Sequence, residues 1–392
     1  MEKRLALTKE GNLTYCTASD ENLGKGRCNH ISHQGVNQTK EDFLNSLSDT
    51  CKILNYNYIS KETKVQTTFL DENNILNIGS FNGLNNALGV QLKGPIIVNS
   101  LNYGLKIKFL KTDELNPKKN LHYIKESYDV LYPSISEDIV SKLISNIDIN
   151  DSKELNSVLY DFHFINGDKT GSLSDNFVED GYFEQVITEP RHSGYIVNHD
   201  DFVNKIIDNR NFDEILNNLN HFYQKSSESN IDFKSFILKQ AALDLITGNK
   251  DRKGNSTNFV FIENFNGDVK PINIDYGRCL QIMWYEKTEN AKLNDDDLDD
   301  FVNDFTEDSI VGGGIFSPSY SGDIKKSVDF ILNNGFKPFN ININKMNIDL
   351  KELENKTKNT KLEYYVKCKI KLLNNMLNNN EIKRLWRDVS ND

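Results

Sequence analysis

Three polar side chains that suit phosphoryl transfer follow one another along the chain: Asp251, Asn258 and Asp275. A loop aspartate can orient or deprotonate an attacking hydroxyl, while an asparagine and a second aspartate can hold Mg²⁺ on nucleotide phosphates. Mg²⁺ prefers hard oxygen ligands and usually takes only one or two carboxylates, which leaves room for phosphate and water. Asn255 is an alternative to Asn258 as the metal ligand, since both stand in the same polar loop. The pattern therefore favours chemistry that uses ATP and magnesium.

The elements around these residues could bring them together. Apolar residues at helical spacing predict a buried helix over 233–246, and a polar loop follows it. An Asn-Gly pair predicts a hairpin turn between strands at 259–263 and 269–274. The return strand delivers Asp275 with Gly277 just behind it, so the hairpin could hold a metal ligand at either end. Because Asp and Asn are also common in turns, the ordered set supports this interpretation and no single residue does.

Two stretches carry a resemblance to a known family. Asn249-Lys-Asp251-Arg252 and, after the predicted hairpin, Ile274-Asp275-Tyr-Gly277 resemble the catalytic loop and metal-binding segment of HipA-like kinases. These are bacterial relatives of the protein-kinase and phosphoinositide-kinase fold. The resemblance implies that Asp251 is the catalytic base and that Asn258 and Asp275 hold the metal, with ATP and Mg²⁺ as cofactors.

The resemblance continues upstream, where Lys125 and Glu137 are similar to the family's strand lysine and the glutamate of the helix that follows. In such an arrangement the lysine contacts the nucleotide phosphates and the glutamate holds it in place. Lys106 and Lys108 are alternatives to Lys125, which could equally be a solvated strand residue. Glu137 also has a second interpretation, because Ser134-x-x-Glu137 is the pattern of a capping box, in which the glutamate bonds the first amide of its own helix.

The resemblance implies an α+β, two-lobed protein-kinase-like fold with an extra N-terminal segment. We expect a segment of unknown role at 1–60, a β-rich N-lobe with the inter-lobe connection at 61–188, and a mainly helical C-lobe at 189–392. Apolar runs broken by Asn and Gly predict the strands, and three-four spacing of apolar residues predicts the helices. Besides the elements already named, we expect strands at 65–70, 94–98, 105–109 and 121–125 and helices at 134–145, 202–219 and 350–386.

The charge distribution limits the classes of partner. The formal net charge of −11 disfavours a nucleic-acid partner, whose phosphates are normally met by basic residues. The block 295–308 supplies most of that charge and contains no Lys or Arg, so it is either a solvated acidic face or a surface for a basic partner. Its acidic residues are Asp295, Asp296, Asp297, Asp299, Asp300, Asp304, Glu307 and Asp308.

No apolar run approaches the ~18 residues that a membrane span needs, so a membrane partner is not expected. Five cysteines in 392 residues give no disulfide framework, and an odd number suits a reducing compartment, which predicts a cytoplasmic protein. Cys16, Cys28, His30 and His33 could be read as zinc ligands, but their spacing does not match the paired ligands of common structural sites. The interpretation as ordinary loop residues is favoured.

The expected function is ATP-dependent phosphoryl transfer to a Ser or Thr hydroxyl, which by resemblance would belong to a protein. Two other classes stay open. One is a catalytically degenerate pseudokinase that binds nucleotide and acts as a regulatory or interaction module. It is supported by Lys253, which stands where the family usually has His. The other is an ATP-dependent enzyme that acts on a small molecule or a peptide.

Overall fold

A computed structural model describes much of the chain. On the basis of its internal contacts, the chain divides into two compact units. The first unit comprises Met1–Thr67, Asn176–Ile231 and Phe259–Ile272, and the second comprises Thr68–Asp175, Asp232–Asn258 and Asn273–Asp392. These bounds differ from the three predicted domains, which stay a prediction. The described residues are 4–7, 13–16, 32–33, 37–38, 67–70, 75–78, 91–100, 104–115, 132–175, 182–184, 232–249, 259–264, 269–282, 298–300, 302–303, 306 and 324–390.

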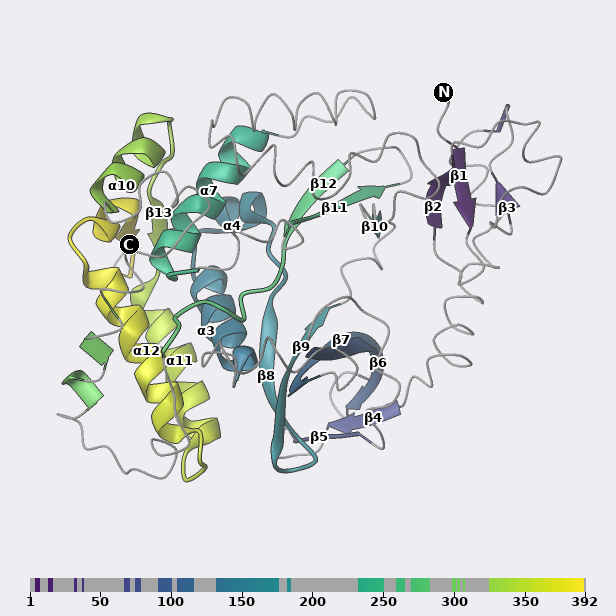
Figure 1. Cartoon of the computed structure of the whole chain (residues 1–392), viewed down its shortest axis with the longest axis horizontal. Coiled ribbons are helices and arrows are strands. Elements are labelled where there is room, and N and C mark those ends of the chain that lie inside the picture. Colours follow the sequence, from purple (N-terminus) through teal and green to yellow (C-terminus); the bar gives the residue numbers. More distant parts are fainter. Residues whose placement is uncertain are drawn as a thin grey trace. The chain divides into compact units, whose positions relative to one another are not determined.

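The second unit contains a mixed β-sheet that closes into a barrel (Figure 1). Strands β5 and β8 pair in parallel, whereas β6 with β7, β7 with β9 and β8 with β9 pair antiparallel. The interior is an apolar cluster that includes Leu76, Leu110 and Ile165, all fully buried. In barrel order the strands are β4 (Thr67–Leu70), β5 (Ile75–Asn77), β8 (Tyr160–Ile165), β9 (Lys169–Asp175), β7 (Gly104–Leu115) and β6 (Gln91–Ser100).

Strand β7 is longer than the sequence predicts. The apolar pattern ends at Phe109, but the strand continues to Leu115. Residues 111–114 of this extension are polar, yet Lys111 and Thr112 are buried because α3 covers this end of the sheet. Pairing with β9 runs as far as Thr112 opposite Gly171. The added residues of β7 therefore lie in the part of the fold where the barrel meets a helix.

Helix α3 (Pro133–Ser145) packs against β7, β8 and β9 (Figure 1). The prediction of a helix at 134–145 is confirmed, and proline at the first helical turn suits its missing N–H. Almost every residue of α3 is buried, polar ones included, since α11 and α12 cover it as well. A helix buried on all sides must satisfy its polar side chains internally. That requirement directs Glu137 toward specific partners.

The remaining helices of the second unit follow the predicted pattern in part. The predicted buried helix at 233–246 is confirmed as α7 (Phe233–Ile246). The helical tail expected at 350–386 is not continuous: it comprises the end of α11, then α12 and η5, because non-helical residues at 358–362 and 379–381 interrupt it. The others are α4 (Ile149–Leu155), α10 (Ile324–Asn333), α11 (Ile343–Thr357), α12 (Glu363–Asn378), η5 (Ile382–Leu385) and the parallel pair β13 (Phe339–Ile341) and β14 (Trp386–Asp388).

The first unit contains two small sheets. One has the order β2-β1-β3, and the other has the order β10-β11-β12. The second sheet confirms the strands of the predicted hairpin, and the predicted elements at 121–125 and 202–219 lie outside the described residues. The strands are β1 (Arg4–Leu7), β2 (Leu13–Cys16), β3 (Ser32–His33), β10 (Tyr182–Glu184), β11 (Phe259–Asn264) and β12 (Val269–Asn273).

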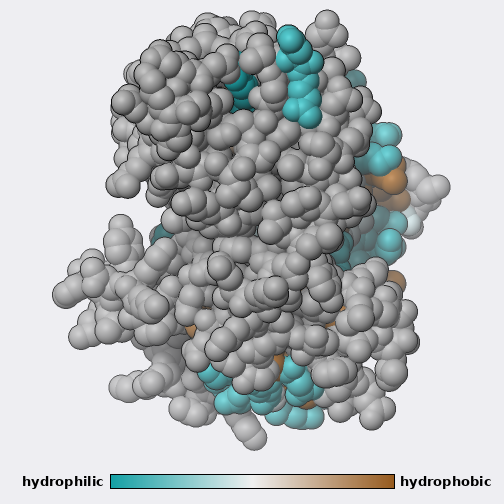
Figure 2. All heavy atoms as spheres, turned by 90° about the vertical axis from the view of Figure 1, so that its right-hand side faces the viewer, coloured by the Kyte–Doolittle hydropathy of each residue, from teal (hydrophilic) through white to brown (hydrophobic). Residues whose placement is uncertain are grey.

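The described surface is mainly polar. On the face that Figure 2 shows, most described residues that reach the surface are hydrophilic, and hydrophobic ones form only small patches. The exposed large hydrophobic side chains among the described residues are Ile149, Leu159 and Ile348. Within the described parts of the chain, no helix has the length and apolar composition that crossing a bilayer requires.

Candidate functional site

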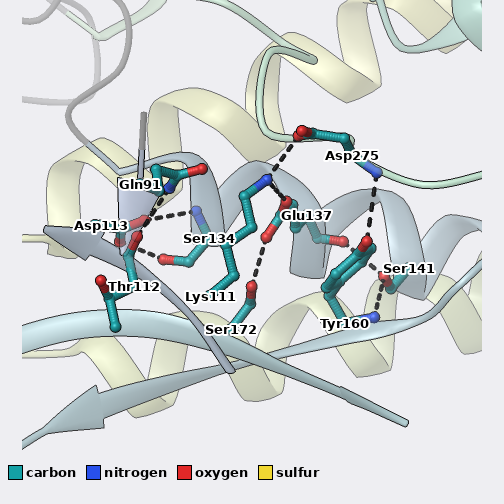
Figure 3. A network of polar contacts seen from close by, with 10 residues as sticks. All are labelled: Gln91, Lys111, Thr112, Asp113, Ser134, Glu137, Ser141, Tyr160, Ser172 and Asp275. Atoms are coloured by element: carbon teal, nitrogen blue, oxygen red, sulfur yellow. Dashed lines mark hydrogen bonds and ion pairs between the residues drawn. The ribbon is translucent and has the colours of Figure 1, made fainter. Parts of the chain in front are cut away.

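A buried lysine joins two carboxylates in the second unit (Figure 3). The Nζ of Lys111, on β7, lies 2.5 Å from Oε1 of Glu137 on α3 and 2.6 Å from Oδ1 of Asp275. The side chains of Lys111 and Glu137 are 6% and 0% exposed, whereas Asp275 is 28% exposed. The three residues are far apart in the sequence, so the fold alone brings them together. One edge of the group, formed by Asp275, remains open to solvent.

Strand β7 presents Lys111 and Asp113 toward α3 because side chains two residues apart share a face of a strand. The neighbouring strand lies close to this point. A Cβ added to Gly171 of β9 would be 2.7 Å from the backbone oxygen of Lys111 and 3.1 Å from Cα of Thr112. Glycine therefore permits the approach of β9 to the backbone of the lysine.

Glu137 is held by side chains from two strands. Besides Lys111, the hydroxyl of Ser172 on β9 donates a hydrogen bond to Oε2 of Glu137. The capping-box interpretation of Glu137 is wrong, because its carboxylate faces the strands and Tyr132, the residue that precedes α3, makes no side-chain cap. The cap comes from β7 instead: Oδ1 of Asp113 accepts the N–H of Ser134 at 3.1 Å.

Charge and burial oppose each other in this group. Burial alone would lower the pKa of Lys111, but the carboxylates of Asp275 and Glu137 outweigh it and raise the pKa well above its ordinary value. Burial raises the pKa of Glu137, and the ammonium of Lys111 acts against that rise. Lys111 is therefore held as a cation. With one ammonium for two carboxyl groups, the site can accept a further positive charge.

Asp275 stands in an unusual backbone conformation. Its φ of +63° lies in the left-handed region, which aspartate tolerates better than most residues but which still carries strain. Its N–H donates to the hydroxyl of Tyr160 on β8 at 3.4 Å. A Cβ on Gly277 would meet Cβ of Pro133 at 2.8 Å, so the glycine of Asp-x-Gly lets this segment pass close to the start of α3.

The end of β12 is fastened just ahead of Asp275. The N–H of Asn273 donates to the carbonyl of Asn156 at 3.1 Å, and the N–H of Val158 donates to the carbonyl of Asn273 at 3.0 Å. The side-chain amide of Asn273 donates to the carbonyl of Leu155 at 2.6 Å. Three hydrogen bonds thus fix the chain to the connection between α4 and β8, which sets where Asp275 emerges.

The chain that enters the predicted catalytic loop is tied to the chain that leaves Asp275. After α7, the amide side chain of Asn249 donates to Oδ1 of Asp244 at 3.1 Å, and both residues are fully buried. The N–H of Leu280 donates to the carbonyl of Thr247 at 2.8 Å. The start of the loop that contains Asp251 is therefore bonded to the segment that follows Asp275.

The structure brings together two of the predicted site residues, Glu137 and Asp275. The lysine between them is Lys111, which the sequence did not indicate because the apolar strand pattern stops before it. The roles predicted for Asp251, Asn258 and Lys125 stay predictions, since these three lie outside the described residues, as does the alternative ligand Asn255. Of the two alternative lysines, Lys108 forms an ion pair with Asp175, and Lys106 is described only as part of the backbone of β7.

Part of the acidic block 295–308 is described, and α12 contacts it. Lys371 of α12 forms an ion pair with Asp299, while Leu298 and Val302 are buried. The side chain of Asn375 donates to Oγ1 of Thr306 at 3.1 Å. Some of the acidic charge is therefore neutralised within the chain, and a basic partner for the rest of the block stays a prediction.

The cysteine and histidine pattern near the N-terminus is described only in part. Cys16 is a buried free thiol on β2, opposite Arg4 of β1, and His33 lies on β3 opposite Ala6. Cys28 and His30 lie outside the described residues. Within the described parts of the chain, no group of three or more His, Cys, Asp or Glu residues is placed to hold a metal ion.

Comparison with known proteins gives a distant likeness to a solved structure. No protein-family model matches the chain, and neither does any curated protein. The crystal structure of a Helicobacter pylori proinflammatory kinase, CtkA, is similar over 74% of this chain and 89% of that chain, with 13% sequence identity and a TM-score of 0.40. A likeness this distant assigns no function, so a functional inference depends on the geometry around Lys111.

Proposed function

We propose that the protein is an ATP-dependent phosphotransferase with a two-lobed, protein-kinase-like fold. The observation that supports this most strongly is the meeting of Lys111, Glu137 and Asp275. In protein kinases a strand lysine pairs with a glutamate of the following helix, and the aspartate of an Asp-x-Gly segment binds magnesium. Here the lysine comes from β7, the glutamate from α3, and the aspartate from Asp275-Tyr-Gly277. The order along the chain is the same as in that arrangement.

Each residue then has a chemical role. Lys111 contacts the nucleotide phosphates, in the role that the sequence predicted for Lys125, and Glu137 holds its ammonium in place. Asp251 acts as the base that accepts the proton of the attacking hydroxyl. Since the chain supplies charge and position rather than covalent chemistry, most of the rate enhancement comes from placement and charge neutralisation. The acceptor we propose is a Ser or Thr hydroxyl of a protein.

The residues present fit a magnesium ion. The carboxylate of Asp275 is a hard oxygen donor on the partly exposed side of the group, and Mg²⁺ needs only one or two such ligands from protein. Asp275 would hold the ion together with Asn258. When bound, Mg²⁺ neutralises charge on the nucleotide phosphates. Lys111 supplies one positive charge beside Asp275, at 2.6 Å.

A specific observation also favours a second candidate, a pseudokinase that binds nucleotide without transfer. The ion pair between Lys111 and Oδ1 of Asp275 competes with a metal for this carboxylate. Lys253, in place of the His usual in the family, adds a departure in the loop next to Asp251. If the pair persists when nucleotide binds, the protein is an ATP-responsive interaction module. The two candidates differ in phosphoryl transfer and not in binding.

Thermal unfolding of the full chain with and without ATP and Mg²⁺ tests binding. A ligand at about 100 times its Kd stabilises the native state by about 2.7 kcal/mol, which is readily measured. We expect wild-type protein to be stabilised by MgATP and Asp275→Asn to lose the magnesium-dependent part. Asp175→Asn is the matched control, because Asp175 is exposed on β9 and is not part of the Lys111 group.

Incubation with γ-labelled ATP then separates the two candidates. Transfer of label to the protein itself or to proteins of a lysate, lost in Asp251→Asn, supports the phosphotransferase. Binding of MgATP with no label on any protein supports the pseudokinase. Wild-type protein that gains no stability from MgATP would contradict both.

A further inference from the structure

Lys369 is a lysine buried in the interior of the second unit. It lies on α12 and is 1% exposed, which places it among the largest fully buried side chains described. Its Nζ donates to Oγ of Ser136 at 2.9 Å and to the carbonyl oxygen of Cys279 at 3.5 Å, and it lies 5.2 Å from the ring centroid of Tyr365. Because an ammonium is strongly hydrated in water, removing it from solvent is expensive. The positions of its two hydrogen-bond partners suggest a reason for this burial.

Both hydrogen-bond partners lie beside the candidate site. Ser136 immediately precedes Glu137 in α3, and Cys279 follows closely after Asp275 and Gly277. Successive helix residues point in different directions, so α3 can present Ser136 to α12 while it presents Glu137 to β7. The N–H of Cys279 donates to the carbonyl of Tyr276 at 3.0 Å, which makes this stretch a closed turn. Lys369 therefore contacts the two backbone segments that carry the two carboxylates.

A second contact from α12 reaches the same end of α3. The rings of Tyr365 and Tyr132 meet edge to face with centroids 5.2 Å apart. Tyr132 is the residue that precedes the first turn of α3. Since Tyr365 stands one helical turn before Lys369, the two side chains lie on one face of α12. This face fixes the start of α3 from the side opposite the barrel.

We propose that Lys369 is a positioning residue for the Lys111–Glu137–Asp275 group, an inference that rests on the proposed function. It bonds α3 and the turn after Asp275 at the same time, and this fixes the separation of the two carboxylates that Lys111 bridges. An apolar side chain of the same length could fill the space, but only the ammonium, with three donors, can bond both oxygens. Residues that violate the usual rules of burial are expected where function requires them.

Hydrogen exchange of the ligand-free full chain tests the positional part directly. In Lys369→Met we expect amides of 134–138 and of 276–280 to exchange roughly tenfold faster, since a hydrogen bond from a charged group is worth about a factor of ten or more. The matched control is Lys367→Met, on the same helix, where the lysine is 34% exposed and pairs with Glu363. That variant should exchange as wild type does in both segments.

MgATP binding tests the link to the site. Lys369→Met should weaken MgATP binding by roughly tenfold, and Lys367→Met should not change it. Lys369→Arg keeps a cationic donor and should recover most of the affinity, which a role in filling volume alone would not predict. Ser136→Ala keeps the lysine and removes one acceptor, so it also serves if Lys369→Met fails to fold. When Ser136→Ala and Lys369→Met are combined, their effects on hydrogen exchange in α3 should not add.

The outcomes separate the two proposals. Wild-type exchange in 134–138 for folded Lys369→Met or Ser136→Ala overturns the positioning role, and so does unchanged MgATP affinity in folded Lys369→Met. An arginine variant as weak as the methionine variant overturns it as well. If wild-type protein binds no MgATP, the proposed function fails, and the exchange data alone then decide whether Lys369 orders the two segments.

Discussion

The pH dependence of stability should carry a signature of Asp113, the residue that caps α3 from β7. Its carboxylate accepts hydrogen bonds from the N–H and the hydroxyl of Ser134 and from the hydroxyl of Thr170, the last at 2.6 Å. Burial is the largest influence on this carboxyl and raises its pKa from the ordinary 3.8 to about 6, although the hydrogen bonds act in the opposite direction. The perturbation is Asp113→Asn, which keeps the shape and removes the titration.

The sign follows from proton linkage. Between pH 4 and 6 the native state retains a proton on Asp113 that the unfolded chain has released, so the free energy of unfolding falls as the pH rises. The stabilising contribution is complete below about pH 4 and is lost above about pH 6. The interval from 3.8 to about 6 corresponds to about 3 kcal/mol. Asp113→Asn has no such loss, so it should gain about that much relative to wild type across this window.

The assay is urea unfolding of wild type and Asp113→Asn at a series of pH values from 4 to 8. The difference between the two proteins removes the titrations that they share. Thr170→Val is the companion variant, because the hydroxyl of Thr170 favours the charged carboxylate. Its loss should move the upper end of the window above pH 6. A difference that stays constant with pH, or that favours wild type as the pH rises, would refute the reasoning, since hydrogen bonding would then outweigh burial.

Three further predictions concern the Lys111 group and the predicted catalytic base Asp251. Gly277→Ala should destabilise the protein by about 1–3 kcal/mol in urea unfolding and weaken MgATP binding, because the new Cβ meets Pro133 at 2.8 Å; unchanged stability and binding would count against close packing there. Lys111→Met should lower stability by about 3–5 kcal/mol, since Glu137 loses its buried cation, and adding Glu137→Gln should restore part of the loss. A double variant no more stable than Lys111→Met would contradict that account. Asp251→Asn should abolish transfer of labelled phosphate while MgATP still stabilises the protein, and retained transfer would remove Asp251 from its proposed role.

The sequence predicts the elements whose apolar periodicity is strong. The helices at 134–145 and 233–246 are confirmed, because apolar residues at three-four spacing identify both, although the burial of each helix extends beyond that stripe. The strand predicted at 105–109 is too short, since β7 continues through Leu110 and the polar residues 111–114 to Leu115. These residues are buried against α3, and burial by an element distant in sequence leaves no local pattern. Periodicity therefore predicts where an element exists better than where it ends.

The same limit explains the candidate site. Asp275 and Glu137 could be named from the sequence because local motifs surround them, a strand before Asp-x-Gly and a helix start before the glutamate. Lys111 could not be named from the sequence, because no neighbouring residue distinguishes it from Lys106 and Lys108. Its identity depends on which face of β7 meets α3. Asp113, two residues on, caps α3 only through the fold, since it is 21 residues from Ser134 in the sequence.

The geometry of β7 and α3 explains why both contacts form together. On the strand, Lys111 and Asp113 are about 6.6 Å apart, the rise of two residues, while Ser134 and Glu137 are about 4.5 Å apart along the helix, the rise of three residues. The long lysine spans the difference, so Asp113 bonds Ser134 as Lys111 bonds Glu137. Rotation of α3 by one residue turns its side chains by about 100° and would break both contacts. The cap and the ion pair therefore select the same register of the helix, and a shift of α3 that takes Glu137 away from Lys111 also takes Ser134 away from Asp113.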